Sequence, residues 1–153
     1  MTVGFNHLGQ LGQLGNQMFQ YAITKSVASK LNVPFKIPNH QNVFDDGIGN
    51  RYTILLFDIF KLESLTNFGF VDTQKYVQEG HFHYDEDIFN ISPQEDFSLW
   101  GFFQSEKYFK DIEKDIRDDF KFKDELVSSC HSIIESVDNP IALHIRRGEF
   151  ITN

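Results

Sequence analysis

The sequence is poor in cysteine and in long apolar segments. It has a single cysteine and no apolar run near the roughly 20 residues that cross a bilayer. One cysteine excludes a disulfide framework and a zinc site built from several thiolates, and it favours a reducing compartment. The N-terminus, MTVGFNHLGQ, lacks the basic flank and the apolar segment of a signal peptide. We therefore expect a cytoplasmic protein without a transmembrane segment, and leave peripheral contact with a membrane open.

Positive charge is also scarce. Lys and Arg total 14 against 22 Asp and Glu, which gives a formal net charge of −8. That balance argues against nonspecific binding along nucleic acid and against a basic membrane-binding patch, so we expect no nucleic-acid partner. Phenylalanine, in contrast, is abundant, with 17 copies among 153 residues. The chain therefore has enough apolar surface for the core of one ordinary domain.

The order of the predicted elements indicates an α/β fold. Residues 2–5 favour a strand, a glycine-rich loop follows, and a helix begins at Asn16 as its cap. The helix carries one apolar stripe, made by Phe19, Ala22, Ile23, Val27 and Leu31. Asn32 and Pro34 end it, and residues 34–37 favour a second strand. This is the opening of a Rossmann-like layer.

The later elements are less regular. Residues 38–50 favour a loop, and residues 52–65 are apolar with a period that fits a helix or a strand. Further strands are expected at 97–103 and 141–145. After Ser105 we expect a helix whose charged residues, within 106–123, lie mostly on the polar, surface-exposed face. A second helix is expected at 124–137, with Cys130 in the core on its apolar side.

Two segments carry the residue types of a phosphate site. Gly9, Gly12 and Gly15 lie between a strand and a helix, where glycines allow a ligand to approach the backbone. Their spacing fits neither a dinucleotide motif nor a P-loop, and a tight structural turn is the alternative. At the end of the strand expected at 141–145, Arg146 and Arg147 precede Gly148 and offer bidentate donors to phosphate oxygens. The alternative is an arginine pair that neutralises Glu149 and neighbouring carboxylates.

Three other groups of residues have side chains that could take part in chemistry. His81 and His83, with Asp85 and Asp87, have the residue types of metal ligands, but a solvated loop explains them better, and we expect no metal. Asp45 and Asp46 offer a carboxylate base in a loop, or a solvated turn. Cys130 and His131 are adjacent on a helix and do not face each other, so a Cys–His nucleophile is not expected.

Three sequence blocks resemble one enzyme family. Residues 14–22, LGNQMFQYA, resemble the N-terminal signature of family 11 glycosyltransferases, the α-1,2-fucosyltransferases. Residues 100–109, WGFFQSEKYF, are similar to the family's middle block. Residues 144–150, HIRRGEF, resemble its HxRRGDY arginine motif. The blocks stand in the family's order and extend over nearly the whole chain.

The resemblance implies a GT-B type enzyme that moves fucose from GDP-fucose to a sugar hydroxyl, commonly O2 of a terminal galactose. Such enzymes invert the anomeric centre without a metal or any cofactor beyond the donor substrate. By position in the motif, Arg146 and Arg147 would be catalytic, neutralising charge on the leaving phosphate. The remaining motif residues would contact substrate: His144, Gly148, Glu149, Gly15, Asn16 and Gln17. For the base, His144, Asp45, Asp46 and Glu149 are candidates only.

The chain also departs from the family pattern. Glu149 stands in place of Asp, Phe150 replaces Tyr, and a Leu-Gly-Gln duplication lengthens the loop before Leu14. Family members are longer, with most of the donor domain after the arginine motif. We therefore expect an acceptor-side α/β domain at 1–140 and only the first strand and arginine motif of the donor domain at 141–153. A complementing chain, self-association, and a noncatalytic nucleotide- or glycan-binding remnant remain alternatives.

Overall fold

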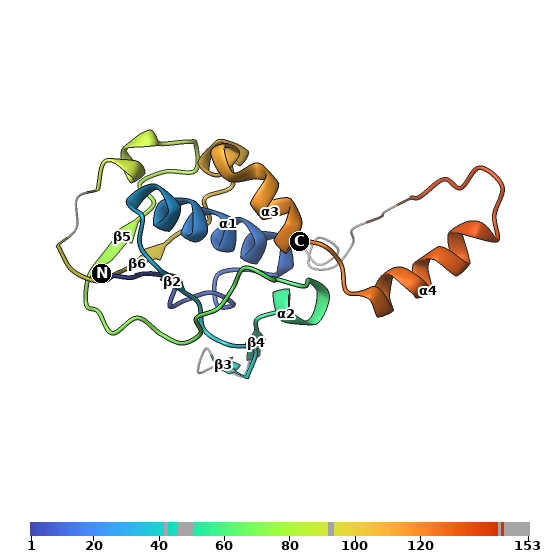
Figure 1. The fold of residues 1–153 in the computed structure, drawn as a ribbon, viewed down its shortest axis with the longest axis horizontal. Helices are drawn as coiled ribbons and strands as arrows, with labels where there is room; N and C mark the ends of the chain where they lie inside the picture. The colour runs from blue at the N-terminus through green and yellow to red at the C-terminus, as the bar shows by residue number, and fades with distance from the viewer. Residues whose placement is uncertain (42, 46–50, 92–93, 144, 146–153) are drawn as a thin grey trace, which may run out of the picture. The chain divides into compact units, whose positions relative to one another are not determined.

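The structure, a computed structural model, describes residues 1–41, 43–45, 51–91, 94–143 and 145. It consists of two units, Met1–Phe122 and Lys123–Asn153, which are described separately. The first unit holds the sheet and the helices that cover it (Figure 1). In the described part of the second unit there is one helix, α4.

The first unit opens with a strand, a helix and a second strand. β1 (Val3–Gly4) leads into α1 (Leu14–Leu31), and β2 (Phe35–Lys36) pairs with β1 in parallel. α1 ends at its C-cap, Asn32, which has a left-handed conformation with φ of 54°, and Pro34 follows two residues later. The predicted strand–helix–strand segment is therefore confirmed.

The predicted start of α1 is wrong by two residues. α1 begins at Leu14 with Gln13 at its N-cap, so Asn16 lies within the first turn. The Asn16 side chain does not cap the helix because its Oδ1 accepts a hydrogen bond from Gln104 Nε2 at 2.5 Å. Asn16 also fills the space beside Gly12, where any added Cβ would collide with its amide.

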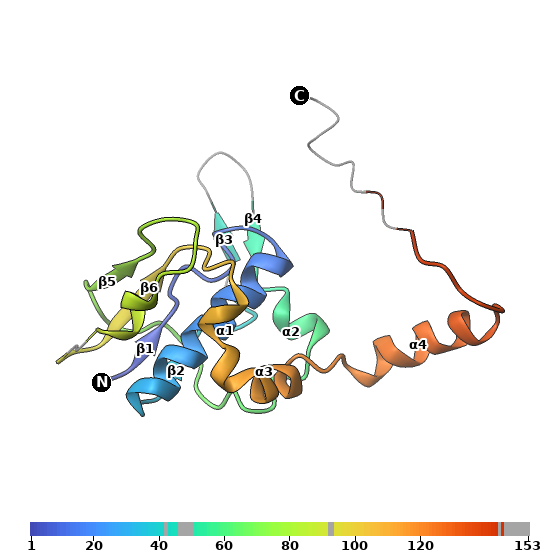
Figure 2. The same cartoon turned by 90° about the horizontal axis from the view of Figure 1, so that it is seen from above.

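A four-stranded parallel sheet forms the centre of the first unit. Its order is β2-β1-β6-β5, with β6 at Phe97–Trp100 and β5 at Tyr76–Gln78. Alternation along the strands puts Val3, Phe97 and Leu99 on one face, where they are fully buried. Figure 2 shows α1 and α3 (Glu113–Asp119) on the same side of the sheet. The predicted α/β class is confirmed.

Several short elements depart from the sequence prediction. β3 (Val43–Asp45) and β4 (Arg51–Thr53) form an antiparallel hairpin, so the loop predicted for 38–50 is wrong at 43–45. The ambiguous segment after it divides into β4 and α2 (Leu56–Ile59). Three 3₁₀ turns complete the unit: η1 (Glu86–Phe89), η2 (Glu106–Tyr108) and η3 (Lys110–Ile112). Ser105 is the N-cap of η2, and its side chain accepts a hydrogen bond from the Lys107 amide.

α1 is buried on nearly every side, which explains its polar residues. Ala22, Ile23 and Val27 are buried as predicted, but so are Gln17 and Gln20. Gln17 donates from Nε2 to the Thr53 carbonyl at 3.0 Å and accepts from the Leu55 amide at 2.8 Å. A buried amide with such partners stabilises the unit because it satisfies backbone groups that would otherwise lie unpaired.

A buried ion pair joins α1 to the end of α3. Asp119 is 1% exposed, and its Oδ2 lies 2.6 Å from Lys25 Nζ. The same oxygen accepts from Tyr21 at 2.7 Å and from Ser64 Oγ at 2.6 Å. The prediction that the charged residues of 106–123 lie on the surface is therefore wrong for Asp119. The carboxylate is stable in this buried position because Lys25, Tyr21 and Ser64 all donate hydrogen bonds to it.

The second unit confirms one predicted helix and corrects its burial. α4 spans Asp124–Glu135, but it has no buried residue and Cys130 is exposed, so the prediction of Cys130 as core is wrong. Residues 141–143 and 145 are not in a strand, because none of the described strands pairs with them, and Ile141 is 94% exposed. The units divide after Phe122; the domain boundary predicted at 140 stays a prediction.

No helix in the described ranges combines the length and the apolar character needed to cross a membrane.

Candidate functional site

The carboxyl ends of β1 and β6 lie side by side in the sheet. Val3 pairs with Phe97 and Gly4 with Ser98, although these strands are far apart in the chain. In open α/β sheets, ligands bind outside the carboxyl ends of the strands, especially where strand order departs from chain order. The segments that leave these ends, residues 5–13 and 101–105, are named the edge loops. They form the candidate site.

α1 fixes both edge loops through buried polar contacts. Gln20 is fully buried, and its Nε2 donates to the Leu11 carbonyl at 2.9 Å and to the Gly101 carbonyl at 3.1 Å. The Asn16–Gln104 hydrogen bond makes a second link between the same regions. Two of the three sequence blocks, 14–22 and 100–109, therefore meet in space at the edge of the sheet.

The second edge loop, residues 101–105, is held in place by the carboxylate of Glu79, the residue directly after β5. Glu79 accepts the backbone N–H groups of Phe102 at 2.7 Å and Phe103 at 2.9 Å. Gly101 has a φ of 151°, and a Cβ there would collide with the Glu79 side chain. The loop thus needs glycine, which sets the direction in which residues 102–105 leave the sheet.

Histidines follow the carboxyl ends of three strands of the sheet. His7 follows β1, His40 follows β2, and His81 and His83 follow β5. His7 lies in the first edge loop, with its ring centroid 4.1 Å from that of Trp100 and 5.5 Å from that of Tyr76. Burial lowers the pKa of His7 below its ordinary value of 6.5, and its Nδ1 is buried without a hydrogen-bond partner. The imidazole is therefore neutral near pH 7.

His81 and His83 stack on each other rather than converge on a point. Their ring centroids are 3.6 Å apart with an angle of 9° between planes, and His81 Nε2 lies 3.9 Å from Asp85 Oδ2. Within the described part of the chain, no group of three His, Cys, Asp or Glu residues is placed to hold a metal ion.

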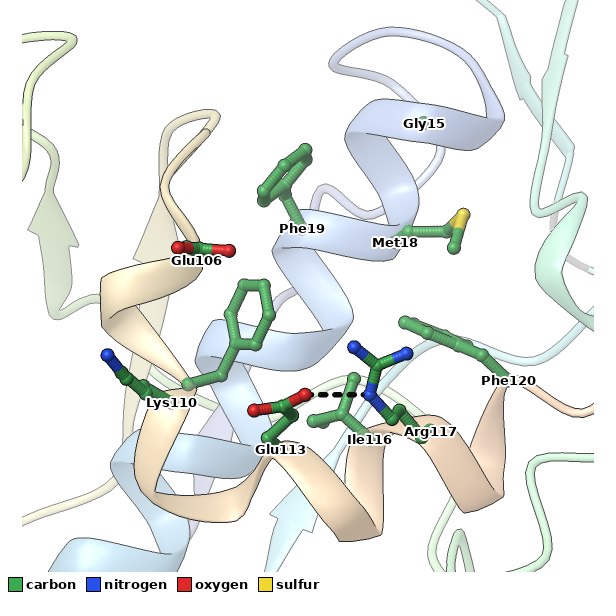
Figure 3. Close-up of a pocket in the computed structure, with 10 residues that line it drawn as sticks. Gly15, Met18, Phe19, Glu106, Lys110, Glu113, Ile116, Arg117 and Phe120 are labelled. Atoms are coloured by element: carbon green, nitrogen blue, oxygen red, sulfur yellow. Dashed lines mark hydrogen bonds and ion pairs between the residues drawn. The ribbon is translucent and has the colours of Figure 1, made fainter.

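A groove of about 510 Å³ lies between α1 and the η2–α3 segment (Figure 3). Its apolar lining comes from both sides: Met18, Phe19, Phe109, Ile116 and Phe120. Charged side chains stand around it, and Glu113 pairs with Arg117 at 2.8 Å. Gly15, from the first turn of α1, also lines the groove. Its volume is within the range of small-ligand sites.

The family model named glycosyl transferase family 11 matches residues 3–153, which include both edge loops and the arginine motif. The chain belongs to glycosyl transferase family 11. Searches of curated proteins and of solved structures gave no match. Membership supports a glycosyltransferase enzyme of a fucosyltransferase family, with a nucleotide-sugar donor and a glycan acceptor.

The structure places only some of the residues predicted to bind substrate. Gly15, Asn16 and Gln17 lie together in the first turn of α1, beside the edge loops. Gly15 is exposed, whereas the Gln17 amide is committed to Thr53 and Leu55. Their contact with substrate stays a prediction. His144, Arg146, Arg147, Gly148 and Glu149, like Asp46, lie outside the described residues, and Asp45 ends β3.

Sequence reasoning missed His7, Gln20 and Glu79. A signal for His7 existed, because it comes two residues after the strand predicted at 2–5 and so at a ligand-binding edge. Gln20 and Glu79 gave no signal. Their partners lie in loops that only the tertiary structure brings close: Gln20 bonds Gly101, 81 residues away.

We expect Gln20→Ala to loosen both edge loops of this family 11 chain. The change leaves the buried carbonyl of Gly101 and the partly buried carbonyl of Leu11 without this donor, so the free energy of unfolding should fall by about 1–3 kcal/mol. Gln13→Ala is the matched control, because Gln13 is exposed and makes no cap bond. Chemical denaturation of both variants measures the effect, and an equal stability for the two would contradict it.

Trp100 should report the protonation of His7, since it is the chain's one tryptophan and lies against the imidazole. A protonated imidazole in contact with an indole quenches its fluorescence. We expect the emission of Trp100 to fall with pH along a titration whose midpoint lies below 6.5. The unfolded chain binds this proton more readily, so stability should also fall as the pH drops below 6.5. His7→Gln should abolish the fluorescence transition; its persistence in that variant would refute the assignment.

Proposed function

We propose that this chain transfers fucose from GDP-fucose to a sugar hydroxyl, O2 of a terminal galactose, as an inverting GT-B enzyme without a metal. The observation that carries the proposal is the family match across residues 3–153, because it includes the arginine motif at His144–Arg147. The parallel sheet with its edge loops at the carboxyl ends supports a nucleotide-sugar enzyme.

The reaction is a single displacement. The acceptor oxygen bonds to the anomeric carbon of fucose, the bond from that carbon to the phosphate oxygen breaks, and GDP leaves with the electron pair. Arg146 and Arg147 stabilise the charge that develops on the leaving phosphate, which guanidinium groups do without a metal. The hydroxyl proton passes to a base, for which His144, Asp45, Asp46 and Glu149 remain candidates.

The described residues contribute a rigid platform to this reaction. Gln20, Glu79 and the Asn16–Gln104 pair hold the edge loops through hydrogen bonds between 2.5 and 3.1 Å. Loops held in this way lose little conformational entropy when a sugar binds, which favours a defined acceptor orientation.

GDP release with two acceptors tests the proposal. Methyl β-galactoside supplies O2, and its 2-deoxy analogue differs only in lacking that oxygen. We expect GDP release from GDP-fucose that depends on the galactoside and is absent with the analogue. Equal release with the two acceptors would overturn the O2 assignment. Saturable binding of GDP-fucose or galactoside without turnover would favour the noncatalytic alternative.

A further inference from the structure

An imidazole–aromatic cluster lies on the face of the sheet opposite the buried side chains that face α1. It consists of His7, Tyr76 and Trp100, with ring centroids 4.1, 5.5 and 6.3 Å apart. Strand alternation puts Tyr76 and Trp100 on this face, away from Phe97 and Leu99. Tyr76 is 44% exposed, and His7 and Trp100 are half-buried. The three rings therefore offer partly open surface beside the first edge loop.

The rest of this face does not continue the cluster as a hydrophobic core. On this face Trp100 pairs with the exposed Gln78, and Tyr76 pairs with Ser98. Ser98 pairs in turn with Gly4, which is covered by the Val71 side chain. The Asn6 side chain holds Val71 in this position: its Oδ1 accepts from the Val71 backbone amide at 2.8 Å, and its Nδ2 donates to the Val71 carbonyl at 2.9 Å. A small, mixed aromatic and polar surface of this kind suits a sugar ring, which has apolar C–H faces and polar edges, better than an aliphatic helix.

The cluster is also uncharged. Burial keeps His7 neutral, and its unpartnered buried Nδ1 favours the tautomer with the proton on Nε2, because burying an unpaired N–H costs more than burying a lone pair. We therefore assign the proton of the neutral imidazole to Nε2, which makes His7 a hydrogen-bond donor at that atom. A neutral site in a chain of net charge −8 favours a neutral sugar over a phosphate-bearing donor.

We propose that His7, Tyr76 and Trp100 bind the acceptor glycan, with a galactose ring stacked on the aromatic side chains and a sugar hydroxyl oxygen accepting from His7. The inference rests on the proposed function for its choice of ligand. It assigns acceptor binding to three described residues of the first unit.

Trp100 emission gives a direct binding test on the whole chain, without GDP-fucose. Titration with lactose should change the emission in a saturable way. Tyr76→Ala should weaken lactose binding about tenfold, because one stacking ring is lost, and Tyr76→Phe should bind as the wild type does. Phe68→Ala is the matched control, since Phe68 is a 50% exposed ring that belongs to a different cluster.

Two binding results would overturn this inference, and so would one kinetic result. One is an emission unchanged by lactose or equally sensitive to it in Tyr76→Ala, with circular dichroism showing that the variant folds. The other is a saturable response to GDP that Tyr76→Ala removes. Transfer to galactoside with an unaltered KM in Tyr76→Ala would reject the cluster and leave the proposed function standing. Lactose binding to the cluster without any fucose transfer would reject the proposed function and leave the acceptor-binding cluster standing.

Discussion

Replacing Asp119 by alanine is expected to lower the free energy of unfolding by about 3–5 kcal/mol. The change leaves Lys25, 12% exposed, without its carboxylate partner, and removes the common acceptor of Tyr21 and Ser64. It also frees the Ser64 amide, which donates to Asp119 Oδ1 at 3.0 Å. Because these donors come from α1 and the 62–65 segment, the loss should separate α3 from the rest of the first unit. Chemical denaturation measures the difference.

Asp118→Ala is the matched control for Asp119→Ala. Asp118 is the preceding residue of α3, but its side chain is 49% exposed and forms an ion pair with Lys121 at 2.7 Å on the surface. We expect little change in stability from its removal, because exposed ion pairs contribute little. If the two variants were equally stable, the buried cluster would not hold α3 in place.

The same cluster predicts a direction of pH dependence. Burial opposes ionisation of Asp119, but hydrogen bonds from Lys25, Ser64 and Tyr21 outweigh it, so the pKa of this carboxyl lies below its ordinary value of 3.8. Its contribution to stability is therefore complete above pH 3.8 and is lost as the pH falls through the folded-state pKa. The stability gap between the wild type and Asp119→Asn should shrink over that range, and a gap that widened on acidification would contradict the assignment.

Arg146→Ala is expected to reduce acceptor-dependent GDP release roughly 100- to 1,000-fold. The proposal assigns to this guanidinium the charge on the leaving phosphate, and loss of one such electrostatic contact has effects of that size. Arg146→Lys should recover only part of the rate, because an ammonium group cannot make the bidentate contact. The fall should appear in kcat more than in KM if the contact strengthens in the transition state.

Arg51→Ala serves as the control for this experiment, as Arg51 is an exposed arginine of the β3–β4 hairpin. It removes one positive charge from the same acidic chain and should leave GDP release unchanged. Equal activity of Arg146→Ala and Arg51→Ala would remove Arg146 from the catalytic account.

The sequence predicts well those elements that local spacing and end signals determine, such as α1. The 3.6-residue spacing of apolar side chains gave α1, and Asn32 with Pro34 gave its end. Short strands with non-local partners were harder. β5 is three residues long and is defined by its register with β6, and β3 lies in a segment rich in Asn and Asp. Such strands form because a partner is available, which spacing within the segment does not show.

Buried polar residues show the same limit. Asp119 fits the charge pattern of a surface helix, yet it is buried. Its carboxylate is stabilised there by hydrogen bonds from Lys25 and Ser64, which lie 94 and 55 residues earlier in the chain. Cys130 shows the opposite error. Its position on an apolar helix face predicts burial, but Cys130 is exposed and α4 has no buried residue in the structure. In the candidate site, the block resemblance located Gly15 and Asn16, whereas the contacts of Gln20 and Glu79 required the fold.

The product of the reaction tests the central claim most directly. We would incubate the chain with GDP-fucose and methyl β-galactoside and determine the product by NMR. The account predicts a disaccharide with fucose joined to O2 of galactose and its anomeric configuration inverted relative to the donor. Free fucose alone, a bond to another galactose oxygen, or retained configuration would contradict it.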